Sequence, residues 1–489
     1  MRKVEASRAY VSNKPLTKQT AAPILLLLSV CPGTFLSHFS AGLVNIALPD
    51  LSVFFQAQLG ITQWIVTGYL LAVMLGLPIM GKLSDRYGKK RIHNIGYLVF
   101  GIGIVLAAFS FSLVFLLAAR FVQGMGAAML QATNMAIITE SYPEEKRGKA
   151  LGIIGTAVGV GALLGPSVGG LLINWFSWQV LFWIQLPLLI AAALMATRFI
   201  PRDNPEEQKR SFDYIGAALF GVALTSIIFV LNQIGEGSVT ALLWPITLTG
   251  ISTLVLFLYW VRKKQDPFIQ LNVLAPPMVR SGSLIIVVSY MATFSAMVVI
   301  PFYLRGVLDI SPSVSGLLLM SYPLLLAIFG PVSGTLADRF GSFIVVMIGL
   351  GIMIASLFGL SMLTTSSSLL VVSLLLCLLG FAMGILTSPN YKLMIGYIPF
   401  QYLGIITSTI ALFRNFGMIM GTAVGVTFMN MFVQGSITEW LLSDHRPANA
   451  QVMLGFHSFF LFVMSLTILA MIYLVVTNKQ AASRGNIEF

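Results

Sequence analysis

The sequence predicts an all-α polytopic membrane protein with fourteen transmembrane helices. Of the 489 residues, 57% are hydrophobic and only 9% are charged, and the mean hydropathy is +0.90. Soluble globular proteins carry far more charge than this. Fourteen stretches also reach about the 20 apolar residues that cross the hydrocarbon core of a bilayer. Lysine and arginine gather almost entirely on one side of the resulting topology.

The predicted spans follow one another along the chain with short polar connections. They are residues 23–48, 60–80, 92–111, 113–138, 150–173, 180–199, 212–233, 242–262, 283–304, 313–334, 342–363, 368–389, 404–431 and 454–477. An even number of spans places both termini on the same side of the membrane. The first run is longer than the apolar region of a signal peptide and lacks a clear cleavage site, which indicates a retained helix.

Basic residues predict the orientation. With the N-terminus in the cytoplasm, the inner segments hold 25 of the 29 lysines and arginines. Arg305 and Arg446 fall on the outer side, and Arg120 and Arg414 fall within spans. This asymmetry predicts that both termini are cytoplasmic, because positive charge is retained on the inner side.

One charged pattern, Gly-x-Leu-x-Asp-Arg-x-Gly, occurs at 81–88 and again at 334–341, which suggests two related halves. Eight spans separate the copies, whereas two six-helix halves would place six there. The spans at 212–233 and 242–262 are therefore predicted as two inserted helices. The predicted division is a cytoplasmic tail (1–22), an N-terminal six-helix bundle (23–200), the inserted helices with linkers (201–282), a C-terminal six-helix bundle (283–477) related to the first by a pseudo-twofold axis, and a cytoplasmic tail (478–489).

The first copy, Gly81 to Arg91, is predicted as a charged loop. Its glycines permit a tight reversal, and its aspartate can cap a helix or pair with arginine. A purely topological role is one interpretation, since positive loops often only orient helices. The other is a conformational latch made of Gly81, Asp85, Arg86, Gly88, Asp338 and Arg339.

Polar side chains recur inside three spans. In 113–138, the residues Arg120, Gln123, Gln131 and Asn134 lie within roughly 60° of one another around a helix of 3.6 residues per turn. They either join helices through hydrogen bonds worth about 0.6 kcal/mol each, or line a cavity, which the cost of a buried arginine favours. The full set of predicted cavity residues is Thr34, His38, Asn45, Arg120, Gln123, Gln131, Asn134, Arg414 and Asn415.

The charge inside the membrane is predicted to be positive. All seventeen acidic residues lie in loops, at the termini or near span ends, with Asp50 and Asp213 closest to the bilayer. His38 is the histidine well inside a span, and imidazole titrates near neutral pH in water. The candidates for proton coupling are His38, Asp50 and Arg120; His38 is alternatively a hydrogen-bonded packing residue.

Two glycine ladders predict close helix contacts, because small residues let helix backbones approach. Pro166 lies within the first ladder, removes a backbone donor and is expected to bend its helix. The ladder residues are Gly161, Gly165, Pro166, Gly169 and Gly170 in span 150–173, and Gly417, Gly421 and Gly425 in span 404–431.

Several of these stretches together resemble the fourteen-helix drug:proton antiporters of the major facilitator superfamily, which include tetracycline and quaternary-ammonium exporters of Gram-positive bacteria. The matching motifs are Gly81 to Arg91, Arg120-Phe-Val-Gln123-Gly124-Met-Gly126, Gly161 to Gly170, Val44-Asn45-Ile-Ala-Leu-Pro49 and Asn174-Trp175-Phe-Ser-Trp178. The resemblance implies alternating access between two bundles, with Asp85 and Arg86 in a cytoplasmic latch and Arg120 tied to proton coupling.

The chain departs from that family where cationic drugs are recognised. Family members usually carry an acid in the first span, four or five residues before the asparagine that matches Asn45; here Ser40 and Ala41 stand there. Met420 lies near the position of a glutamate found in some relatives. We therefore expect neutral, zwitterionic or anionic substrates rather than permanent cations.

The expected function is proton-coupled export of small amphipathic compounds or drugs across a bacterial inner membrane, by a monomer whose partners are substrate, protons and lipid. Export or flipping of a specific anionic or lipid-like metabolite is the alternative, uptake stays open, and a non-transporting sensor is disfavoured because no soluble domain is present. We expect no nucleic-acid partner, metal, cofactor or enzymatic activity. The sequence contains no glycine-rich phosphate loop, and its histidines are dispersed. Cys31 and Cys377 both fall in apolar runs and are predicted to be packing residues.

Overall fold

The structure, a computed structural model, describes residues 23–483 except 58, 63, 143, 174, 203–212, 236–240, 242, 265–266, 268–270, 311, 400–401 and 433–448. The predicted N-terminal tail, most of the first linker, Asn174 and Arg446 lie outside the described residues. The described part of the chain is helical and contains no strand. Helices suit a lipid environment because they satisfy their backbone hydrogen bonds internally.

The helices have the following bounds. The first group comprises α2 (Pro23–Ile46), α3 (Leu48–Phe54), α4 (Leu59–Thr62), α5 (Trp64–Tyr87), α6 (Lys89–Ala108), α7 (Leu113–Ser141), α8 (Glu144–Ile173), α9 (Val180–Trp183), α10 (Gln185–Phe199), α11 (Tyr214–Gly235) and α12 (Leu243–Lys263). The 3-10 turn η1 (Leu271–Leu274) precedes α13 (Pro277–Phe302), the π-turn η2 (Tyr303–Val307), α14 (Pro312–Leu319), α15 (Ser321–Phe340), α16 (Ser342–Ser361), α17 (Leu369–Gly396), α18 (Leu403–Phe432) and α20 (Asn449–Ser483).

Every predicted span overlaps a helix. Twelve helical stretches in the described chain are long and apolar enough to cross a membrane. The other two predicted spans fall on α11, whose apolar part is Tyr214–Val230, and on α18. At 1.5 Å per residue the 30 residues of α18 extend about 45 Å. Membrane crossing by these two helices, and the grouping into two six-helix bundles, stay predictions.

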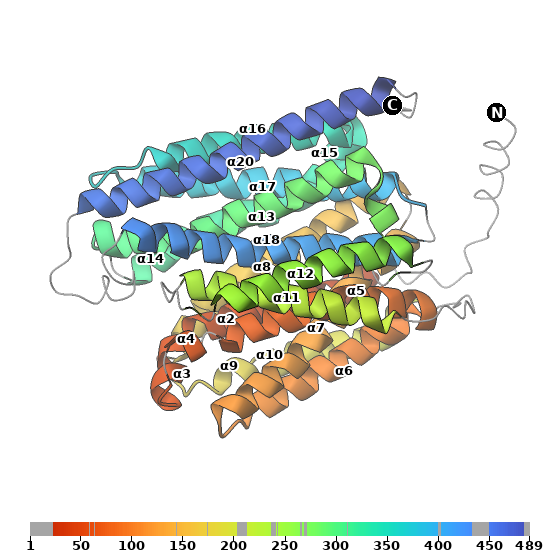
Figure 1. Cartoon of the computed structure of the whole chain (residues 1–489), viewed down its shortest axis with the longest axis horizontal. Helices are drawn as coiled ribbons and strands as arrows, with labels where there is room; N and C mark the ends of the chain where they lie inside the picture. Colours follow the sequence, from red (N-terminus) through yellow and green to blue (C-terminus); the bar gives the residue numbers. More distant parts are fainter. Residues whose placement is uncertain are drawn as a thin grey trace, which may run out of the picture.

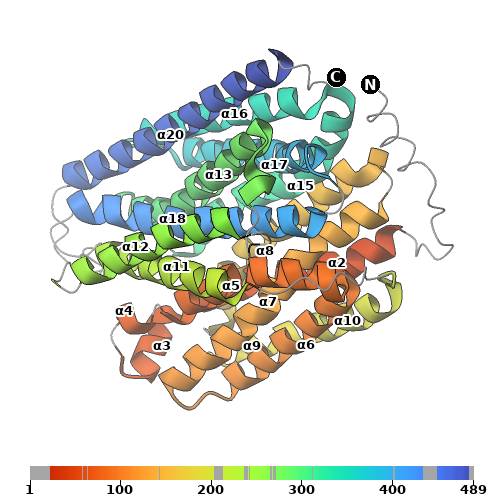
Figure 2. The same cartoon turned by 45° about the vertical axis from the view of Figure 1, so that its right-hand side comes forward.

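The helices run roughly side by side in three groups (Figures 1 and 2). α13, α15, α16, α17 and α20 lie on one side of the molecule, and α2, α5, α6, α7, α9 and α10 lie on the other. α8, α18, α11 and α12 lie between them. α11 packs on α12 and also contacts both α5 and α18. The middle of the molecule is therefore where segments far apart in the sequence meet.

The repeated charged pattern differs from its prediction as a loop. α5 continues through Asp85 and Arg86 to Tyr87, and α6 begins at Lys89, so the turn is confined to Gly88. The second copy behaves alike, because Gly341 alone joins α15 to α16. Gly88 has φ 97° and Gly341 has φ 85°, a backbone region that favours glycine. The predicted loop is wrong in extent because one glycine suffices to reverse the chain.

Glycines lie at close contacts between helices in both predicted glycine ladders. A Cβ on Gly161 would lie 2.5 Å from the carbonyl oxygen of Phe35, so α8 presses directly on the backbone of α2. A Cβ on Gly421 would lie 2.5 Å from the carbonyl oxygen of Met291, which places α18 equally close to α13. Larger side chains at these two glycines would force the helices apart.

Candidate functional site

Arg120 is fully buried in α7 and is surrounded by neutral acceptors. Its Nε donates to the carbonyl oxygen of Ile65 at 3.1 Å, and its Nη1 donates to Ser40 Oγ at 2.9 Å and to Gln123 Oε1 at 2.6 Å. Its Cζ lies 4.1 Å from the centroid of the Tyr69 ring, a cation–π distance. Helices α2, α5 and α7 thus each provide one hydrogen-bond acceptor to this cation.

Gln123 extends this arrangement to α10. Its Nε2 donates to Ser40 Oγ at 3.0 Å and to Gln185 Oε1 at 3.3 Å. Gln185 is itself fully buried, and its Nε2 donates to the carbonyl oxygen of Leu181 at 2.7 Å. The predicted cavity set omits both Ser40 and Gln185. A glutamine inside an otherwise apolar span was the signal available for Gln185.

A second group of polar contacts connects α2, α5, α7 and α18. The Tyr69 hydroxyl donates to the carbonyl oxygen of Ser37 at 2.7 Å, and Gln131 Nε2 donates to Ser37 Oγ at 2.6 Å. Gln131 Oε1 accepts from Arg414 Nη2 at 2.7 Å and from Asn415 Nδ2 at 3.0 Å. Gln131 and Arg414 are 283 residues apart in the chain. One amide side chain therefore joins α2 and α18 through α7.

Arg414 is as buried as Arg120 but has fewer partners. Its Nε and Nη1 have no hydrogen-bond partner among the described residues, and neither does Asn415 Oδ1. The ion pairs found in the described chain do not include Arg414. His38 and Tyr290 are close enough to interact electrostatically with it.

The predicted residues of the first span separate into two groups. Thr34 and His38 are buried, His38 Nδ1 lies 2.8 Å from the carbonyl oxygen of Thr34, and Thr34 Oγ1 accepts a hydrogen bond from Asn134 Nδ2. His38 Nε2 is buried without a partner among the described residues. Asn45 and Asp50 are exposed, and Asp50 lies in the separate helix α3. The structure thus brings His38, but not Asn45 or Asp50, to the buried polar groups.

The predicted latch residues take part in ion pairs at helix ends. Lys89 Nζ lies 3.4 Å from Asp85 Oδ1 and 2.7 Å from Glu140 Oε1, which joins the ends of α5, α6 and α7. Lys392 Nζ lies 2.5 Å from Asp338 Oδ1 and joins α17 to α15. Arg86 and Arg339 are exposed.

Sequence reasoning did not assign Lys89, Glu140 or Lys392 to the latch. The basic residue directly after Gly88 was a signal for Lys89. Nothing in the sequence pattern linked Lys392 to Asp338. A latching role for these residues stays a prediction.

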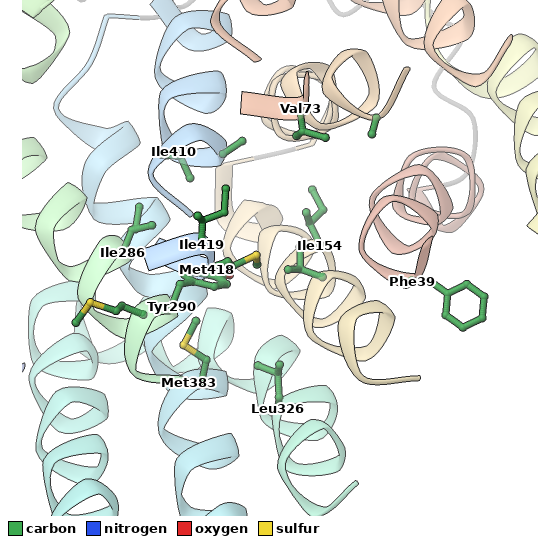
Figure 3. Close-up of a cluster of buried hydrophobic side chains, with 14 of the residues drawn as sticks. Phe39, Val73, Ile154, Ile286, Tyr290, Leu326, Met383, Ile410, Met418 and Ile419 are labelled. Atoms are coloured by element: carbon green, nitrogen blue, oxygen red, sulfur yellow. The ribbon is translucent and has the colours of Figure 1, made fainter. Parts of the chain in front are cut away.

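Buried apolar side chains of α18, α13 and α17 gather in one cluster (Figure 3). Ile410 and Met418 lie four residues before and after Arg414, and therefore share its face of α18. Figure 3 shows Met418 close to Tyr290 of α13 and Met383 of α17, with all three buried. Ile154 of α8 belongs to the same hydrophobic cluster, whereas Phe39 of α2 points away from it in the view of Figure 3. Among the described residues, no group of three or more His, Cys, Asp or Glu residues is placed to hold a metal ion.

The sequence profile of the Major Facilitator Superfamily matches residues 30–422 and 282–488. The chain belongs to this superfamily. Its resemblance to the drug:proton antiporters of the superfamily is also shown, because named relatives include drug resistance proteins.

Two curated relatives match over most of their length. The "Riboflavin transporter RibZ" of Clostridioides difficile is 30% identical over 427 residues, which cover 87% of this chain and 91% of that protein. The "Lincomycin resistance protein LmrB" of Listeria monocytogenes is 28% identical over 415 residues, which cover 84% of this chain and 88% of that protein. These relatives are transport and resistance proteins rather than enzymes.

A solved structure shares the fold. The human organic anion transporter MFSD10 aligns with a TM-score of 0.66 and 16% sequence identity, covering 93% of this chain and 100% of that one. At this identity the likeness concerns the fold alone. The family match and the apolar helices identify the chain as an integral membrane transporter of this superfamily.

Proposed function

We propose that this chain is a proton-coupled exporter of small amphipathic compounds that works by alternating access. The observation that carries the proposal is the buried contact of Gln131 with Ser37 on one side and with Arg414 and Asn415 on the other. It joins α2 and α7 to α18, helices that the sequence assigns to different six-helix bundles. A side chain that forms hydrogen bonds to both bundles can stabilise one of the two conformations of an alternating-access transporter relative to the other.

The relatives support a drug or metabolite as substrate. LmrB is named for lincomycin resistance and RibZ for riboflavin transport. The second name favours the alternative function, export of one specific endogenous metabolite. In both cases we propose fourteen crossings, cytoplasmic termini, a bacterial inner membrane and a monomer.

Proton coupling is part of the proposal and needs a carrier. His38 is the strongest candidate, because its Nε2 is buried without a partner in the described chain. Asp50 is the weaker candidate because it is exposed. Transport of protons and substrate in opposite directions requires that proton binding and substrate binding both shift the equilibrium between the same two conformations.

Inside-out vesicles containing the protein test the function. Respiration acidifies the vesicle lumen, and we expect added riboflavin or lincomycin to release luminal protons, followed with a pH-sensitive acridine dye. Release should vanish in His38→Ala and persist in Asp50→Asn at equal protein levels. Substrate uptake without proton release would contradict antiport, and no uptake of any compound would contradict export.

A further inference from the structure

Arg414 carries hydrogen-bond donors that the described chain leaves unused. Its side chain is 0% exposed, and only Nη2 has an acceptor, Gln131 Oε1 at 2.7 Å. Nε carries one N–H and Nη1 carries two, and both atoms are buried without a partner. A guanidinium stays protonated in proteins, and a buried charge is costly unless it is paired and hydrogen-bonded.

The side chains around Arg414 do not supply the missing negative charge. Gln131 and Asn415 are neutral amides, Tyr290 is a phenol, and His38 is neutral or cationic. The carboxylates with described partners lie elsewhere, in the ion pairs of Asp85, Glu140 and Asp338 and in the contacts of Asp213 with Gly216 and Trp260. Any anion that meets Nε and Nη1 must therefore come from outside this part of the chain.

We propose that Arg414 is an anion-binding residue of the substrate site and that it makes the protein prefer compounds with a carboxylate or a similar small oxyanion over their neutral analogues. Hydrogen bonds between a guanidinium and a carboxylate are charge-assisted and roughly twice as strong as neutral ones. The inference rests on the proposed function, because it assumes that substrate reaches α18. It adds to that function a preference for amphipathic anions.

The apolar part of such a compound has a place beside the cation. Ile410 and Met418 lie on the same face of α18 as Arg414. Met418 is close to Met383 and Tyr290 (Figure 3), and Ile154 of α8 belongs to the same hydrophobic cluster. Methionine side chains adapt to irregular shapes, which suits contact with varied apolar groups. One helix face therefore offers both a cation and an apolar surface.

Paired fluorescent probes test the inference on the purified full-length protein in lipid nanodiscs. N-dansylglycine carries a carboxylate, and N-dansylglycinamide is its neutral amide with the same fluorophore. We expect the native protein to bind the carboxylate at least tenfold more tightly, as measured by fluorescence titration. Arg414→Gln should remove this preference, whereas Arg414→Lys should keep part of it. Arg280→Gln, which removes an exposed positive charge, should leave the preference unchanged.

Thermal unfolding gives a second readout in case Arg414→Gln alters folding. N-dansylglycine should raise the Tm of the native protein and of Arg280→Gln, but not that of Arg414→Gln. Equal affinity for the two probes, binding of neither, or a preference that survives Arg414→Gln would overturn the assignment. Riboflavin-driven proton release, measured in parallel, reports on the proposed function separately. If riboflavin releases protons but the carboxylate preference is absent, the role of Arg414 is refuted and the proposed function stands.

Discussion

Arg120 and Arg414 are both completely buried arginines in long apolar helices, but their surroundings differ. Arg120 donates to three acceptors on three helices and lies over the ring of Tyr69. Among the described residues, Arg414 has a single acceptor, Gln131 Oε1, which also accepts from Asn415. Among the described residues, Arg120 leaves one guanidinium nitrogen, Nη2, without a partner, whereas Arg414 leaves both Nε and Nη1. More of the cost of burying the charge is therefore offset within the protein for Arg120 than for Arg414. This difference suggests that Arg120 holds its helices together and that Arg414 is available to a ligand.

The largest expected difference appears when each arginine becomes glutamine. Arg120→Gln removes the Arg120 hydrogen bonds to Gln123 Oε1 and to the carbonyl oxygen of Ile65, and one of the two donors to Ser40 Oγ. An unsatisfied buried polar group costs about 1–3 kcal/mol. We expect a lower Tm and loss of transport. Arg414→Gln removes an unpaired charge, so its Tm without ligand should equal or exceed that of the native protein. Thermal unfolding of both variants in nanodiscs measures this, and a similar loss of stability in both would remove the distinction.

Gln131→Glu would give Arg414 a counter-charge inside the protein. A carboxylate at the position of the accepting Oε1, 2.7 Å from Nη2, forms a charge-assisted pair with Arg414. We expect the preference for N-dansylglycine over its amide to fall at least tenfold, because the substrate then competes with an internal anion. Gln131→Leu is the matched control without charge and should retain the preference. If Gln131→Glu also kept the preference for N-dansylglycine over its amide, the anion would not reach Arg414.

The ion pairs at the helix ends should matter least. Lys392 and Asp338 are 34% and 21% exposed, and pairs accessible to solvent typically contribute about 0–1 kcal/mol. We expect Lys392→Gln to slow transport by less than threefold. Lys89→Gln should have a larger effect, because Lys89 contacts both Asp85 and Glu140. Initial transport rates in proteoliposomes compare the two, and a greater loss for Lys392→Gln would reverse the order.

The positions of helices could be read from the sequence with few errors. Apolar runs of about 20 residues placed a helix at every predicted span, because a bilayer-crossing segment must be both apolar and internally hydrogen-bonded. The charged repeat was assigned to a loop, since its charges exclude it from hydrocarbon. The structure extends α5 and α15 through it, because exclusion from lipid does not prevent a helix from continuing into water.

The polar stripe of α7 was also visible in the sequence, because residues on one helix keep a fixed angular relation. Its partners were not visible, since they depend on how neighbouring helices are rotated and how deeply they pack. Tertiary structure alone decided that Ser40 and Gln185 belong to the Arg120 network and that Asn45 does not.

The sequence by itself determined that two arginines are buried in an apolar membrane protein of this superfamily. Only the tertiary structure decided that they differ, because hydrogen-bond partners come from helices distant in the chain. α2, α5 and α7 supply three acceptors to Arg120, while α7 supplies one to Arg414. Local spacing fixes the face on which a side chain lies, and packing fixes what that face meets.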